Sequence, residues 1–245
     1  MWSDTAPEYD KIVQDELNDF RAKAWLELIQ EQISENEILR ALDVGTGPGF
    51  FSILLSQAGY QVTAIDSSHK MIEIARKNVE KIGGHADFKI MDAHALDLNN
   101  DMFDLIISRN VTWTLHDPIT AYREWFRVLK PGGLLLIFDA NWNLYLYDPL
   151  IMDEVIKRDR EYRSRFGEPA DDNYGPDQKQ SDFQKFPLHN QHRPSWDNGA
   201  LGALGYEGIV NDLTISSRVL DEKEQLLYGG TPPFMILAKK PMSVQ

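Results

Sequence analysis

A glycine-rich turn that interrupts an apolar segment constrains the fold of this chain more than any other feature of its sequence. Residues 41–44 are mostly apolar, and glycines follow at positions 45, 47 and 49, before Phe50. Because glycine has no Cβ, it can adopt a positive φ and let a ligand lie directly against the backbone. The pattern predicts a buried strand, a tight turn and a helix that together bind a ligand.

Asp66 extends this pattern, because it lies about 20 residues beyond the turn, at the end of the next apolar segment. At that separation, the end of a second strand brings a carboxylate to the two hydroxyls of a ribose. We therefore expect a cofactor that contains a nucleoside. The alternative is that Asp43 and Asp66 only cap helices and that the glycines only form turns.

The spacing of the glycines narrows the class of cofactor. A dinucleotide-binding turn requires G-x-G-x-x-G, whereas this chain has G-x-G-x-G and a phenylalanine, Phe50, at the third glycine position. A site for the pyrophosphate of a nicotinamide cofactor is therefore disfavoured.

Strands and helices alternate along the first 140 residues, in the order that is typical of a parallel sheet with helices on both faces. The predicted strands are 39–44, 61–65, 86–91, 103–108 and 133–139, and the predicted helices are 8–33, 49–58, 68–82 and 118–129. Segments 207–216 and 233–238 are expected to close the sheet as an antiparallel hairpin. The expected fold is α/β, with a doubly wound, mostly parallel sheet that binds its ligand at the carboxyl ends of the strands.

Five sequence motifs follow one another between residues 36 and 140. They are residues 43–49, Asp66, residues 88–93, residues 105–110 and the turn at residues 129–133. In this order they resemble the motifs of the class I S-adenosylmethionine-dependent methyltransferases, specifically the small-molecule type related to ubiquinone and menaquinone methylases. The resemblance implies a seven-stranded Rossmann-like sheet with an antiparallel last strand.

The resemblance also implies how S-adenosylmethionine is held and, after transfer, S-adenosylhomocysteine. The loop at residues 43–49 wraps the methionine part, Asp66 accepts the ribose hydroxyls, and Asp92 accepts the amino group of adenine. Relatives use an N-terminal helix as a lid, which would place Tyr9 over the cofactor. The full set of implied cofactor-binding residues is Tyr9, Asp43, Gly45, Thr46, Gly47, Gly49, Asp66, Ser67, Met71, Asp92, Ala93, Arg109 and Asn110.

The chain is expected to form one domain with three parts. Residues 1–35 form the helical lid, residues 36–140 and 195–245 form the core, and residues 141–194 form a cap inserted after the fifth strand. This insertion includes a charged helical stretch at 149–166, and an excursion of such length is expected to cover a substrate. The alternative is a surface insertion that makes dimer contacts.

The acceptor of the methyl group is expected between the cap and the sulfonium end of the cofactor. The candidate substrate-binding residues are Trp113, Trp142, Tyr145, Tyr147, His189 and His192. The aromatic residues of the insertion could equally pack a core.

His116, after the fourth strand, is the candidate general base for an acceptor that arrives protonated. Alternatively, it caps the next helix or faces solvent. His189 and His192 could be a base, a metal pair or solvent-facing residues. No metal site is predicted, because no carboxylate cluster accompanies them.

The composition disfavours several partners. A formal net charge of −13 argues against a nucleic-acid substrate, because its phosphates would be repelled. The absence of cysteine excludes disulfides and a thiolate nucleophile. Because neither a leader pattern nor an apolar run of ~20 residues is present, we expect no membrane partner and a cytoplasmic location.

Three functions stay open. The favoured one is transfer of a methyl group from S-adenosylmethionine to a small-molecule acceptor by in-line displacement, carried out by a monomer or homodimer. The second is a protein that binds the cofactor without turnover. The third is a nicotinamide-dependent oxidoreductase, which the glycine spacing and Asp92 disfavour.

Overall fold

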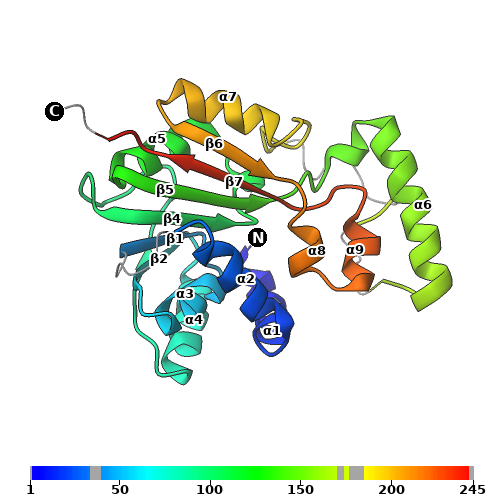
Figure 1. Ribbon diagram of the computed structural model, residues 1–245. Coiled ribbons are helices and arrows are strands. Elements are labelled where there is room, and N and C mark those ends of the chain that lie inside the picture. The colour runs from blue at the N-terminus through cyan, green and yellow to red at the C-terminus, as the bar shows by residue number, and fades with distance from the viewer. Residues whose placement is uncertain (1, 34–39, 170–173, 177–184, 243–245) are drawn as a thin grey trace.

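The computed structural model describes residues 2–33, 40–169, 174–176 and 185–242, and a seven-stranded mixed sheet forms the centre of this part of the chain. The strand order is β3-β2-β1-β4-β5-β7-β6, with β7 antiparallel to both neighbours (Figure 1). The strands are β1 (Arg40–Val44), β2 (Gln61–Asp66), β3 (Ala86–Ile90), β4 (Phe103–Arg109), β5 (Leu129–Asp139), β6 (Glu207–Asp212) and β7 (Phe234–Lys239). The predicted fold class is confirmed.

Helices cover both faces of the sheet. On one face lie α1 (Trp2–Leu17), α2 (Phe20–Gln30), α3 (Phe50–Gln57) and α4 (His69–Lys81), and on the other lie α5 (Pro118–Val128) and α7 (Ser195–Ala203) (Figure 1). Because side chains alternate along a strand, Leu105 and Ile107 of β4 pack in the apolar core beneath α1–α4, and Ile106 packs in the core beneath α5 and α7. Both cores are apolar, as expected for parallel strands that are buried on each face.

The N-terminal region forms two helices, not the single helix predicted over residues 8–33. α1 ends at Leu17, and α2 begins after Asp19, whose side chain accepts a hydrogen bond from the backbone N–H of Arg21. An aspartate at this position stabilises the start of a new helix by satisfying a donor that the first turn leaves without a partner. The apolar spacing continues across the break, so helical periodicity alone misses it.

The turn predicted at residues 129–133 is a bulge inside a longer strand. β5 begins at Leu129, which pairs with Phe103, but the next pair joins Leu105 to Leu134. The extra residues include Gly132 at φ +79°, and the backbone N–H of Gly132 donates to the carbonyl of Lys240. Hydrogen bonding to the segment after β7 therefore keeps the bulge in an extended strand.

The predicted strand at 207–216 is shorter in the structure. β6 ends at Asp212, whose carboxylate accepts hydrogen bonds from the N–H and the hydroxyl of Thr214 and so turns the chain. α8 (Ser216–Val219) and α9 (Glu222–Tyr228) follow. These two short helices and α7 were not predicted, although α9 begins with a capping box between Asp221 and Glu224.

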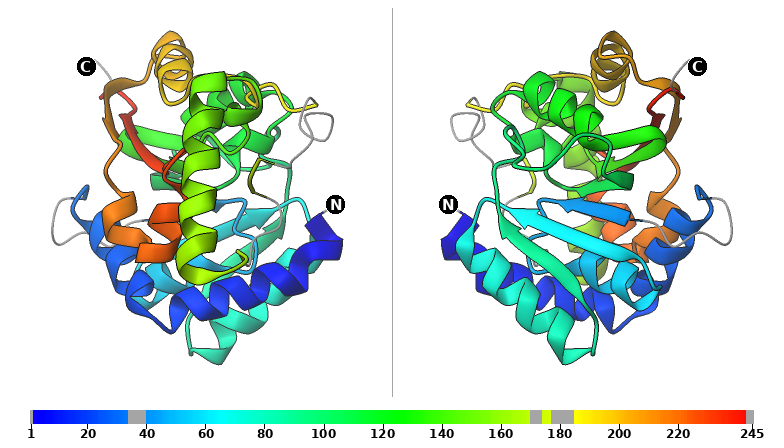
Figure 2. Two further views of the ribbon diagram at one scale, coloured as in Figure 1. Left: turned by 90° about the vertical axis from the view of Figure 1, so that its right-hand side faces the viewer. Right: turned by 90° about the vertical axis from the view of Figure 1, so that its left-hand side faces the viewer.

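The insertion after β5 lies at the carboxyl ends of the parallel strands. It contains a 3-10 helix, η2 (Leu144–Leu146), and α6 (Pro149–Phe166), which confirms the helix predicted at 149–166. Figures 1 and 2 show α6 standing beside α9 at this end of the molecule. A third apolar cluster, which includes Tyr145, Val155 and Leu227, joins these helices. None of the helices in the described ranges combines the length and apolar character of a membrane span.

Candidate active site

The glycine loop between β1 and α3 is braced by a buried carboxylate. Asp43 is 2% exposed, and its Oδ2 accepts hydrogen bonds of 2.7 Å from both Thr46 Oγ1 and Ser52 Oγ. Burial raises the pKa of Asp43 to about 6, although the two hydroxyl donors oppose that shift. Asp43 and Thr46 therefore shape the loop with their side chains directed at each other. Ser52, one turn into α3, was missed because a serine inside a helix carries no distinctive signal.

Two positions of the loop favour glycine for different structural reasons. A Cβ on Gly45 would lie 2.3 Å from Cγ2 of Val111, so this position lets the segment after β4 approach closely. Gly47, at φ +52°, would place a Cβ in open space, with no atom within 4 Å. The backbone at Gly47 therefore has open space on this side. Gly49 precedes α3 and packs against Ala75 of α4.

Asp66, at the end of β2, connects the loop to the next turn. Its Oδ2 accepts a hydrogen bond of 3.0 Å from the N–H of Gly47, and its Oδ1 accepts one of 2.8 Å from the N–H of Ser68. Burial raises the pKa of Asp66 above its ordinary value. Each oxygen accepts one backbone donor and keeps capacity for another, so the carboxylate can still accept two hydroxyls. Beside it, Ser67 is exposed and Met71 is buried at the start of α4.

A pair of histidines stands beside Asp92, after β3. The carboxylate of Asp92 accepts a hydrogen bond of 2.9 Å from the backbone N–H of His94. The same carboxylate lies 2.5 Å from Nδ1 of the His94 ring. His116 is exposed, and its ring centroid lies 3.7 Å from that of His94. The carboxylate itself remains 57% exposed and open to a ligand. Ala93 supports this turn with its carbonyl, which accepts a hydrogen bond from Trp125 Nε1.

Arg109 and Asn110, at the end of β4, face different surroundings. The guanidinium of Arg109 lies 4.3 Å from the ring centre of Phe50 and 2.7 Å from a carboxylate oxygen of Glu16 on α1. Arg109 therefore joins the N-terminal helices to the core. Asn110 adopts φ +57° and leaves its side chain exposed at the strand end.

The helix predicted as a lid is also tied to the glycine loop. Asn78 of α4 donates from Nδ2 to Asp10 of α1 at 2.8 Å and to the carbonyl of Pro48 at 3.0 Å. Tyr9, one residue before Asp10, is 39% exposed. Asn78 was not predicted as a site residue, since a polar residue within an amphipathic helix usually faces solvent.

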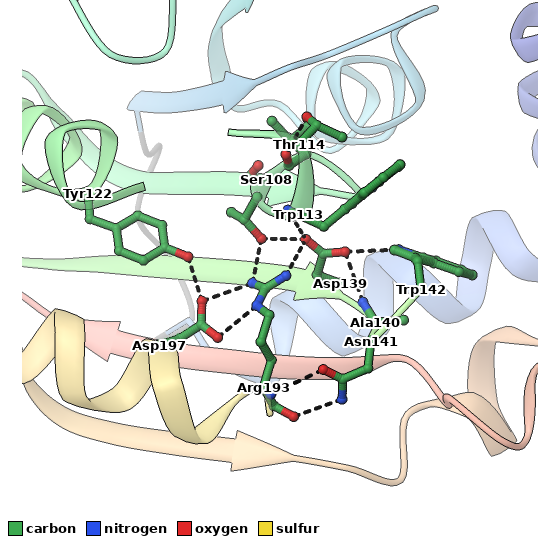
Figure 3. A network of polar contacts seen from close by, with 12 residues as sticks. Ser108, Trp113, Thr114, Tyr122, Asp139, Ala140, Asn141, Trp142, Arg193 and Asp197 are labelled. Carbon is green, nitrogen blue, oxygen red and sulfur yellow. Dashed lines mark hydrogen bonds and ion pairs between the residues drawn. The ribbon is translucent and has the colours of Figure 1, made fainter. Parts of the chain in front are cut away.

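A buried carboxylate, Asp139, holds two of the predicted substrate-binding residues. Its Oδ2 accepts the backbone N–H of Trp113 at 3.1 Å, and its Oδ1 accepts the indole N–H of Trp142 at 3.0 Å (Figure 3). The N–H of Ala140 and the hydroxyl of Thr112, from the 3-10 helix η1 (Thr112–Thr114), also donate to it.

Arg193 completes this network from the far end of the insertion. Its guanidinium lies 3.0 Å from Asp139 and 2.8 Å from Asp197 of α7, and all three side chains are at most 1% exposed. Tyr122 of α5 donates its hydroxyl to Asp197 at 2.6 Å. Burial disfavours the charge of Arg193, but the two carboxylates outweigh this effect and raise its pKa well above the ordinary value.

The remaining predicted substrate-binding residues are dispersed. Tyr145 is 1% exposed and packs edge-on against Tyr174 in the core of the insertion. The rings of Tyr147 and His189 are in contact, with 4.8 Å between their centres. The side chain of His192 is 70% exposed and lies 3.8 Å from a carboxylate oxygen of Asp148.

The two histidines of the insertion therefore have different neighbours. Among the described residues, no three histidine and carboxylate side chains are grouped closely enough to hold a metal ion.

Comparison with known proteins supports a methyltransferase. The family described as "Methyltransferase domain" matches residues 42–137. A demethylmenaquinone methyltransferase from Renibacterium salmoninarum is 31% identical over 137 residues, which cover 56% of this chain and 56% of that protein. A ubiquinone biosynthesis O-methyltransferase from Ruegeria pomeroyi is 31% identical over 121 residues, 49% of each. The chain thus matches about half the length of these curated relatives.

Solved structures share the architecture over nearly the whole chain. A SAM-dependent methyltransferase from Aquifex aeolicus has a TM-score of 0.60 at 19% sequence identity, with 94% of this chain and 98% of that chain covered. The strand order and the glycine loop are consistent with the methyltransferase domain that the sequence comparison matches. Residues 42–137 therefore match a methyltransferase domain, and the chain is similar to S-adenosylmethionine-dependent methyltransferases, among them distant relatives in quinone biosynthesis.

Proposed function

We propose that this protein binds S-adenosylmethionine at the carboxyl edge of its parallel strands and transfers the methyl group to a small-molecule acceptor beneath the insertion. The observation that carries the proposal is the contact between Asp66 and the N–H of Gly47. This contact puts the carboxylate next to the accessible backbone of the loop. A nucleoside attached to an amino acid requires both features at adjacent positions.

The residues present fit this cofactor. Asp66 has the capacity to accept both ribose hydroxyls, and the exposed carboxylate of Asp92 can accept the amino group of adenine. The open side of Gly47 offers bare backbone to the methionine part. Tyr9, Ser67, Met71, Ala93 and Asn110 remain proposed neighbours of the cofactor. Arg109 would act indirectly, because its guanidinium already contacts Phe50 and Glu16.

Bound S-adenosylmethionine would supply an electrophilic methyl group, so the protein mainly has to align the acceptor with it. We assign this task to the surface that carries Trp113 and Trp142. The contact between His116 and His94 places His116 beside Asp92, the proposed adenine residue. This position supports a role in holding the cofactor more than the role of general base.

Methyl transfer can be tested with S-adenosylmethionine that carries a deuterated methyl group. The purified protein is incubated with this cofactor and a library of phenols, amines and thiols, and labelled products are detected by mass spectrometry. We expect at least one labelled product, lost in Asp66→Asn and retained in Asp87→Asn, a control in which an exposed carboxylate on β3 is changed. Cofactor binding without any product would instead indicate a binding protein.

A further inference from the structure

The two ends of the insertion are fastened to each other. The side-chain amide of Asn141 donates to the carbonyl of Arg193 at 2.9 Å and accepts from its N–H at 3.1 Å. Asn141 is the second residue after β5, and Arg193 is the second residue before α7. This pair of hydrogen bonds therefore closes the loop that carries η2 and α6.

The side chain of Arg193 continues from this closure into the core. It contacts Asp139 and Asp197, and its Nη2 lies 2.6 Å from the hydroxyl of Thr112. Elements far apart in the sequence, η1, β5 and α7, are thereby fixed around one buried cation (Figure 3). Two carboxylates around one guanidinium leave no charge of Arg193 unpaired.

Asp139 has no capacity left for a substrate. Thr112, Trp113, Ala140, Trp142 and Arg193 all donate to its two oxygens. A carboxylate that accepts five donors is unsuited to take up a proton or to bind a ligand. Its effect on the site must pass through the groups that it holds.

Two of those groups carry large aromatic rings. The rings of Trp113 and Trp142 project from Asp139 toward the side where β5 ends (Figure 3). Both side chains are only partly buried, and each ring packs edge-on against an aromatic neighbour, Phe186 for Trp113 and Tyr228 for Trp142. Asp139 thus holds the Trp142 ring through its indole N–H and holds the backbone from which the Trp113 ring projects, and both side chains retain exposed surface next to the strand ends.

We propose that Asp139 and Arg193 are positioning residues that hold Trp113 and Trp142 as two walls of the acceptor site. This inference rests on the proposed function. Arg193 links the two features, because its backbone bonds Asn141 to close the insertion and its side chain bonds Asp139. A purely structural network would support folding without affecting acceptor binding.

The orientation of the rings can be measured without an acceptor. Protein labelled with 5-fluorotryptophan is studied by fluorine NMR as wild type and as Asp139→Asn, with resonances assigned through tryptophan-to-phenylalanine variants. We expect the Trp113 and Trp142 resonances to shift or broaden, and those of Trp25 and Trp125, which lie in the two main cores, to stay in place. Unchanged Trp113 and Trp142 resonances would overturn the proposal, whatever the activity.

The effect on the acceptor is measured with a molecule found in the product screen. Trp142→Phe removes the indole N–H that donates to Asp139 and retains an aromatic ring. We expect KM for the acceptor to rise about tenfold, because a hydrogen bond to a charged group is lost, while the Kd for S-adenosylmethionine and kcat change less than twofold. The matched control is Tyr206→Phe, which removes a buried hydroxyl that donates to the backbone carbonyl of Tyr122 and bonds neither Asp139 nor Arg193.

The outcomes separate the two proposals. If wild type methylates nothing, the proposed function fails, and the fluorine spectra alone decide whether Asp139 orients the rings. If wild type is active but KM is as little affected by Trp142→Phe as by Tyr206→Phe, the positioning role is wrong. Should Asp139→Asn fail to fold, Thr112→Val, which removes a donor to Asp139, replaces it in the fluorine experiment.

Discussion

Replacing Arg193 with methionine should destabilise the fold strongly. The substitution keeps an unbranched apolar side chain but removes the guanidinium, which donates to Asp139, Asp197 and Thr112 at distances between 2.6 and 3.0 Å. Two buried carboxylates would remain without a cation. Removal of one partner from a buried ion pair costs about 3–5 kcal/mol, because the remaining charge is uncompensated.

Urea unfolding followed by circular dichroism at neutral pH measures this loss as a change in the free energy of unfolding. For a chain of this size, the midpoint of thermal unfolding should fall by about 6–20 °C. The control is Arg218→Met, which removes a two-bond contact with Glu31 at the surface, where the arginine side chain is 33% exposed. We expect that control to cost under about 1 kcal/mol. Equal losses in the two variants would refute the claim that burial of the charges determines the cost.

Three further substitutions test the cofactor site. Asp43→Asn should change the pH dependence of stability. Burial raises the folded pKa to about 6, above the ordinary value of 3.8, so the free energy of unfolding of wild type falls by up to about 3 kcal/mol as pH rises from about 4 to beyond 6. The free energy of unfolding in urea should vary less with pH in the variant. A pH dependence equal to that of wild type would contradict this. Gly47→Ala and Gly59→Ala both place alanine at positive φ with no neighbouring atom within 4 Å. Only Gly47→Ala should weaken the affinity for S-adenosylmethionine measured by calorimetry, by about tenfold or more. Equal affinities in the two variants would place the ligand elsewhere. Tyr9→Ala should weaken the same affinity if α1 covers the cofactor, and an unchanged Kd would end that idea.

The sheet and the cofactor edge could be predicted because their signals are local. The glycines require particular backbone conformations, and the separation between Gly45 and Asp66 follows from one strand-turn-helix-strand unit. Five motifs in order then indicate the resemblance to methyltransferases. The predicted bounds of β2, β3 and β4 each agree with the structure to within one residue, since short apolar segments bounded by polar or glycine-rich turns mark these strands.

The network around Asp139 could not be predicted, because its members are brought together only by tertiary structure. Thr112 and Arg193 lie 81 residues apart in the chain, and no periodic pattern connects them. An arginine followed by proline in a polar segment resembles an ordinary surface loop. The break at Asp19 and the end of β6 at Asp212 were missed for a different reason: side chains there satisfy backbone donors, which apolar patterns do not report.

Calorimetric titration with S-adenosylmethionine, S-adenosylhomocysteine and NADH, on wild type and Asp66→Ala, tests the central claim most directly. We expect both adenosyl ligands to bind wild type, NADH not to bind, and the substitution to weaken both affinities by about tenfold or more, since a carboxylate that accepts two hydroxyls is lost. Binding of NADH alone, or equal affinities in wild type and variant, would contradict the assignment of this edge as the S-adenosylmethionine site.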